Sequence, residues 1–198
     1  ALVFASAGYE AIIDTPAIIS RVRQEMYDGI KTKDIHDVLI MVTRSLIERD
    51  PAYSYVAARL LLQYMYREAI GEVDDYAKLE DSHKAAFVRN IERGVETGWF
   101  DKELLTFNLA KLADALVIER DHDFKYLGLQ TLQSNYLSKE VQTRKLLETP
   151  QMFWMRVAMG CALAEKTPEA REQQAIEFYE VMSAMYYMPS SPTLYHAG

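Results

Sequence analysis

Residues 149–164 read TPQMFWMRVAMGCALA and are the most informative segment for the fold class. Proline at its second position suits the first turn of a helix, where its fixed φ is already helical and its missing N–H is not needed. Gln151 and Arg156 are almost the only polar residues that follow. Because a helix that is apolar nearly all round is a buried one, we predict that this segment forms the core of an all-α domain. Cys161 is then expected to be a buried, inert thiol.

The helical period extends over most of the chain. Apolar residues recur at steps of three and four, most clearly over 35–47, and few segments alternate as strands do. Asp50-Pro51 separates two predicted helices, of which Thr32 caps the first and Gly71 ends the second. Further helices are expected over 82–96, 124–137 and 169–188. The predicted fold class is therefore all-α, a helical bundle.

The composition fits a packed domain with few turns. The chain has 198 residues, of which 49% are apolar and 26% charged, with only 8 glycines and 6 prolines. That length suits one domain or slightly more. From Glu72 to Asp81 the apolar period fades and acidic residues cluster, so we predict a boundary between a module at 1–71 and a module at 72–198.

The charge balance and the cysteine count exclude several classes of protein. Lys and Arg number 22 against 29 Asp and Glu, a net charge of -7, so we expect no nucleic-acid partner. No apolar run approaches the roughly 18 to 20 residues that a membrane span needs, so no membrane association is expected. A single cysteine cannot form an internal disulfide, which favours a cytoplasmic protein.

The common sequence signatures of enzymes are missing. The chain has no Gly-rich phosphate loop, HExxH, CxxC or GxSxG motif. Two E-x-x-H patterns, Glu80 to His83 and Glu119 to His122, place a carboxylate and an imidazole on one helix face, as di-iron bundles do. Such ligands sit in mid-helix among apolar neighbours, whereas these lie in the acidic linker and at a helix boundary. We therefore interpret both as solvated capping clusters, with no metal site, and keep a di-iron bundle as a less favoured alternative.

Several segments in register resemble one known family. Residues 27–36 read YDGIKTKDIH and residues 49–60 read RDPAYSYVAARL. Both closely resemble the second half of the ATP-cone in the large subunit of aerobic ribonucleotide reductase. Later segments resemble the helical N-terminal domain of that subunit, in the same order: residues 126–132, 148–151, 155–158, 192–194 and 197–198. The resemblance implies a truncated ATP-cone at 1–71 and, at 72–198, the helical domain that leads into a catalytic barrel.

The resemblance implies an enzyme, ribonucleoside-diphosphate reductase, of which this chain is one part. The family reduces ribonucleoside diphosphates to deoxyribonucleotides for DNA synthesis through a cysteine thiyl radical, with electrons from a cysteine pair. A metal-containing small subunit supplies the radical. The family's active-site cysteines and finger-loop residues lie in the barrel, beyond Gly198, and Cys161 matches none of them. We therefore expect the chain to have no catalytic residue, to bind no cofactor covalently and to be inactive without the barrel and the small subunit.

Three positions take roles from the resemblance. Thr32 matches the cone threonine that contacts ATP or dATP, the allosteric effectors. Arg67 falls where the family has a basic side chain at that effector site. Ser191 matches the Ser or Thr that precedes the Pro-Thr-Leu motif and helps to hold the substrate phosphate. A hydroxyl suits that task because it satisfies phosphate oxygens without adding charge.

A non-catalytic reading stays open beside the reductase. A cone-like bundle can act as a nucleotide sensor or as an assembly surface without contributing to catalysis. For a reductase fragment, two explanations of the length are open: a piece of a longer protein, or one part of a naturally split large subunit.

Overall fold

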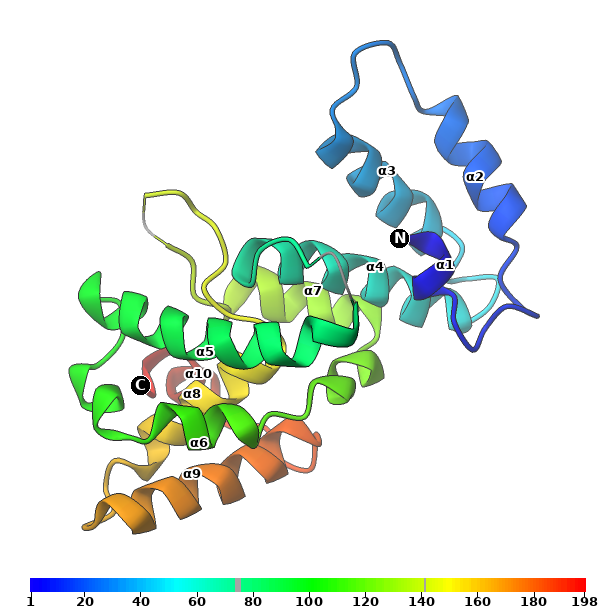
Figure 1. Cartoon of the computed structure of the whole chain (residues 1–198). Helices are drawn as coiled ribbons and strands as arrows, with labels where there is room; N and C mark the ends of the chain where they lie inside the picture. The colour runs from blue at the N-terminus through cyan, green and yellow to red at the C-terminus, as the bar shows by residue number, and fades with distance from the viewer. Residues whose placement is uncertain (74–75, 141) are drawn as a thin grey trace. The chain divides into compact units, whose positions relative to one another are not determined.

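The computed structural model describes residues 1–73, 76–140 and 142–198, apart from the side chain of Tyr76 (Figure 1). In these ranges the regular structure is helical, and the β-bridge between Lys139 and Leu146 is isolated. The all-α class is confirmed. Asp74 and Asp75, part of the predicted acidic linker, lie outside the described residues.

The helices follow one another with short connections. The α-helices are α1 (Leu2–Ala5), α2 (Thr15–Gln24), α3 (Thr32–Arg44), α4 (Ala52–Ala69), α5 (Leu79–Glu96), α6 (Leu109–Asp114), α7 (Tyr126–Asn135), α8 (Pro150–Ala162), α9 (Pro168–Ser183) and α10 (Ser191–His196). Short 3-10 turns cover Tyr76–Lys78, Lys102–Thr106 and Ile118–Asp123.

The chain divides into two compact units. Unit 1 comprises Ala1–Tyr64 and His122–Gln133, and unit 2 comprises Met65–Asp121 and Ser134–Gly198. Both α4 and α7 therefore contribute residues to each unit. The module boundary expected after Gly71 stays a prediction.

In unit 1 the local sequence explains how the helices start. The carboxylate of Asp14 accepts from Ala17 N–H (3.0 Å) at the start of α2, and that of Asp50 accepts from Ala52 N–H (2.8 Å) at the start of α4. The predicted cap at Thr32 is wrong. Lys31 occupies the capping position and no side chain caps α3, because the helix already begins at Thr32. Thr32 is one residue past the capping position, so its hydroxyl no longer faces the free N–H groups of the first turn.

Unit 2 is built around α8, as the sequence predicts. Residues 150–159 and Ala162 are buried, and α8 packs along α9 (Figure 1). The rings of Phe153 and Trp154 meet edge to face at 4.8 Å. The expected burial of Cys161 is wrong, because its side chain is exposed in the last turn, beyond the covered part of the helix. The partial burial that remains still raises the pKa of the thiol, which disfavours a nucleophilic role.

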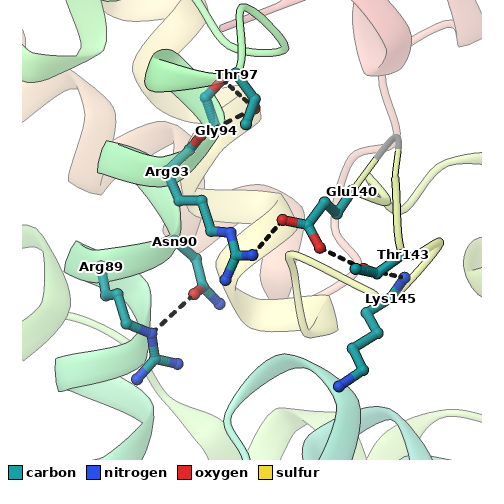
Figure 2. A network of polar contacts seen from close by, with 8 residues as sticks. All are labelled: Arg89, Asn90, Arg93, Gly94, Thr97, Glu140, Thr143 and Lys145. Atoms are coloured by element: carbon teal, nitrogen blue, oxygen red, sulfur yellow. Dashed lines mark hydrogen bonds and ion pairs between the residues drawn. The ribbon is translucent and has the colours of Figure 1, made fainter.

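A short loop after α7 is fixed to α5 in the same unit. Figure 2 shows Arg93 of α5 paired with Glu140, whose second oxygen accepts from Thr143. These hydrogen bonds, the one from Thr143 first, hold the pKa of Glu140 below its ordinary value. One turn earlier on α5, the amide of Asn90 donates to the carbonyls of Ala69 and Leu147, at 2.9 Å each. Glu140 and Leu147, on either side of the loop, are therefore both held by side chains of α5.

Candidate functional site

Hydroxyl groups gather at the start of α10, where Ser191 lies. Ser191 is the first residue of this helix, it is exposed, and its Oγ lies 3.0 Å from the hydroxyl of Tyr136. Ser190 Oγ lies 3.4 Å from Thr193 Oγ1. The four side chains are neutral donors and acceptors, a chemistry suited to a polar anion such as a phosphate.

The segment that carries these hydroxyls is held on the core by Arg156. This buried residue of α8 forms an ion pair with the buried Glu148, and its Nη1 donates to the carbonyl of Ala197 at 2.6 Å. Gly160, one turn further along α8, allows the backbone at 197–198 to approach, since an added Cβ would overlap it. The arginine predicted as a rare polar residue of the core helix therefore anchors the end of α10.

A second polar group lies inside unit 2 around Asp121. Its carboxylate is fully buried and accepts from the Tyr66 hydroxyl (2.6 Å) and from Gln151 Nε2 (2.7 Å). Tyr179 donates to Gln151 Oε1 at 2.7 Å and accepts from Val117 N–H at 2.8 Å. Four elements of the unit are thus joined by one chain of hydrogen bonds, and Gln151 is its central link.

The solvated interpretation is wrong for the first E-x-x-H pattern, whose histidine is buried, whereas Glu119 and His122 of the second pattern are both exposed. His83 is fully buried, with Nε2 at 3.0 Å from Thr149 Oγ1, while Glu80 stays exposed and pairs with Lys84. Burial lowers the pKa of His83 to about 3 and raises that of Asp121 to about 7. The two pKa values therefore shift in opposite directions for the same reason, the free-energy cost of burying a charge.

No metal centre arises from these groups in the part of the chain that the structure describes. Within it, no three His, Cys, Asp or Glu side chains are placed to hold one ion. The described helices also include none with the length and apolar character to cross a membrane.

In unit 1, Thr32 lies on the helix that also carries Lys33 and His36, both of which approach the ring of Tyr64. The hydroxyl is exposed at the start of α3, one turn before His36, so both face the same side of the helix. His36 Nε2 lies 2.9 Å from the carbonyl of Leu60, and its ring lies 6.4 Å from that of Tyr64. Lys33 Nζ lies 5.6 Å from the centre of the Tyr64 ring. An aromatic face, a cation and a hydroxyl together suit a nucleotide.

Arg67 belongs to the other unit. It is exposed in the last turn of α4, whereas Thr32 lies in unit 1, so the two predicted effector residues fall in separate compact units.

Sequence reasoning missed His36, Tyr64 and Tyr136. His36 was within reach, because it stands in the quoted motif four residues after Thr32, but no local pattern marks Tyr64 or Tyr136.

Comparison with known proteins finds a family model for the last part of the chain and relatives that match most of it. Residues 122–198 match the family model described as the all-alpha domain of ribonucleotide reductase. The chain is 42% identical over 173 residues to the ribonucleoside-diphosphate reductase subunit alpha of Chlamydia trachomatis, covering 87% of this chain and 16% of the relative.

Relatives of lower identity also match most of the chain. The subunit alpha of Enterobacteria phage T4 is 30% identical over 94% of this chain and 24% of its own length. Subunit alpha of ribonucleoside-diphosphate reductase 1 of Escherichia coli is 30% identical over 86% of this chain and 22% of its own length. The chain thus spans between a sixth and a quarter of the curated relatives it matches.

Proposed function

Because this chain belongs to the ribonucleotide reductase large-subunit family, as its N-terminal region, we propose that it contributes to the reduction of ribonucleoside diphosphates to deoxyribonucleotides. In this proposal the cytoplasmic enzyme needs the catalytic barrel of the large subunit and a small subunit that supplies the radical. The region itself contributes a substrate contact and an allosteric nucleotide site.

The substrate contact is the Ser191 hydroxyl. The observation that carries it is the exposed hydroxyl at the start of α10, fixed to the core through Arg156 and Ala197. A preorganised neutral donor binds a phosphate oxygen without first losing a competing charge partner. Ser191→Ala is therefore expected to raise KM for the diphosphate in the complete reductase.

The matched test of Ser191 uses Ser190→Ala. Both serines are exposed, but Ser191 is the first residue of α10 and pairs with Tyr136, whereas Ser190 precedes the helix and pairs with Thr193. KM should rise about three- to tenfold in Ser191→Ala, the range for one hydrogen bond, and less in the control. Equal KM values in the two variants would remove Ser191 from the substrate site.

The allosteric nucleotide is ATP or dATP, bound at Thr32 with His36, Lys33 and Tyr64 around it. For Arg67, which lies in unit 2, the proposed role in effector binding rests on the resemblance alone. Supporting the proposal, Lys33 next to the Tyr64 ring contributes a positive charge for the phosphates. The site lies on the ordered start of α3, where free N–H groups also favour an anion.

Equilibrium titration of the chain with dATP tests the effector site. Thr32→Ala and Tyr64→Ala should each weaken binding, whereas Thr15→Ala, at the first position of α2 in the same unit, should not. Binding that is unchanged in Thr32→Ala would contradict the proposal. Binding that leaves reduction by the complete enzyme unaffected would favour the non-catalytic sensor instead.

A further inference from the structure

Tyr136 contacts α10 at two points. Its ring stacks on that of Tyr195, with centres 5.0 Å apart and planes at 29°, and its hydroxyl lies 3.0 Å from Ser191 Oγ. Ser191 and Tyr195 are four residues apart, so they lie on the same face of the helix. One side chain from outside α10 therefore fixes both the position and the rotation of that face.

The backbone next to Tyr136 is itself held firmly. Leu137 and Ser138 are buried. Ser138 N–H donates to Glu148 Oε2 at 3.0 Å, and its carbonyl accepts from Leu147 N–H at 2.9 Å. Since Glu148 also pairs with Arg156, the same buried carboxylate connects the anchor of Tyr136 to the anchor of α10.

Either hydroxyl of this pair could be the donor, and their chemistry favours the tyrosine. A phenol, with a pKa near 10, is a stronger donor than an aliphatic hydroxyl. A serine hydroxyl has only one proton to donate. If it donates that proton to a neighbouring side chain, it cannot donate it to a ligand. When Tyr136 donates to Ser191 Oγ, the serine proton is left for an anion, and the donated bond polarises it.

We propose that Tyr136 is a positioning residue of the phosphate site, which donates to Ser191 Oγ and directs the serine proton at a phosphate oxygen of the ribonucleoside diphosphate. The inference rests on the proposed function of Ser191. Tyr136 acts through Ser191, and its effect should therefore vanish when the serine hydroxyl is absent.

The test is a double-mutant cycle in the complete large subunit with its small subunit. Tyr136→Phe keeps the ring stack and removes the hydroxyl. It should raise KM for CDP about three- to tenfold and leave kcat within about twofold, as expected for a lost ground-state hydrogen bond. Ser191→Ala should have an effect of similar kind, and Tyr136→Phe added to it should change KM no further.

Two further variants separate positioning from folding. Ser191→Thr keeps a hydroxyl and should retain a KM near that of the wild type. Adding Tyr136→Phe to Ser191→Thr should raise that KM. Tyr186→Phe removes a hydroxyl from an exposed tyrosine nearby in sequence and should leave KM unchanged. The thermal midpoints of all variants, measured in parallel, show whether any KM change comes from unfolding.

Each outcome decides between the two proposals. A KM that rises in Ser191→Ala but not in Tyr136→Phe overturns the role of Tyr136 and leaves the substrate contact intact. Additive effects in the double variant also overturn it, because they mean independent action. A KM unchanged in Ser191→Ala overturns both.

Discussion

At the residue scale, Asp121 and His83 make opposite contributions to the pH dependence of stability. Burial raises the pKa of Asp121 from 3.8 to about 7, so its folded form binds the proton more tightly and the free energy of unfolding falls as pH rises from about 4 to 7. Burial lowers the pKa of His83 from 6.5 to about 3, so the unfolded form binds the proton more tightly. The stability that His83 contributes is therefore lost as pH falls from about 6.5 to about 3.

Removing Asp121 should expose the contribution of His83. In the wild type the two trends oppose each other between about pH 4 and 6.5. In Asp121→Asn only the histidine trend is left, so the free energy of unfolding should fall more steeply as pH is lowered from 6.5 to 4. Urea unfolding at several pH values measures the slope. Asp123→Asn, at an exposed carboxylate of the same 3-10 turn, is the control. A slope equal to the wild type would refute this explanation.

The burial of these two groups was beyond sequence reasoning. Glu80 to His83 stands next to an acidic stretch, which favours a solvated interpretation. His83 is buried by packing against Tyr66, at a ring distance of 4.8 Å, and by Thr149, which is 66 residues away in the chain. Such long-range partners leave no local pattern.

At the element scale, two helical glycines give a matched prediction. A Cβ at Gly94 of α5 would overlap the ring of Phe100, whereas at Gly128 of α7 the nearest atom, on Phe124, is 3.9 Å away. Gly94→Ala should destabilise by about 1 to 3 kcal/mol through overpacking, although alanine is the better helix former. Gly128→Ala should stabilise by up to about 1 kcal/mol. Denaturant unfolding of the two variants compares them, and a gain in both would contradict the close contact.

The helices were predictable because their start and stop signals are local. Thr149-Pro150 and Thr167-Pro168 mark the starts of α8 and α9, and Gly71 and Gly98 adopt positive φ after α4 and α5. The end of α9 was predicted about five residues too late. The helix ends at Ser183, and Met185 adopts φ +60°, a conformation that a methionine in the sequence does not predict.

At the scale of the whole molecule, the isolated chain should not reduce CDP. It has one cysteine, exposed and with a raised pKa, whereas the family's reduction needs a cysteine pair and a thiyl radical. Incubation of the purified chain with CDP, a dithiol and a small subunit should give no dCDP above background. Formation of dCDP under these conditions would refute the assignment of catalysis to the barrel.

The site as a whole was only partly predictable. The motif at 192–194 marks Ser191, but its partner Tyr136 is 55 residues earlier, in a segment predicted only as a helix over 124–137. Arg156 was recognised as an exception in the core helix, although its contact with Ala197 was not foreseen. Folding brings these residues together through packing that no single segment encodes.

The most direct measurement replaces the matching segment of the Chlamydia trachomatis subunit alpha, 42% identical over 173 residues, with this chain and assays reduction of CDP. We predict that the chimera reduces CDP and that its KM rises in Ser191→Ala. A chimera that is folded and bound to its small subunit but forms no dCDP would contradict the proposed function.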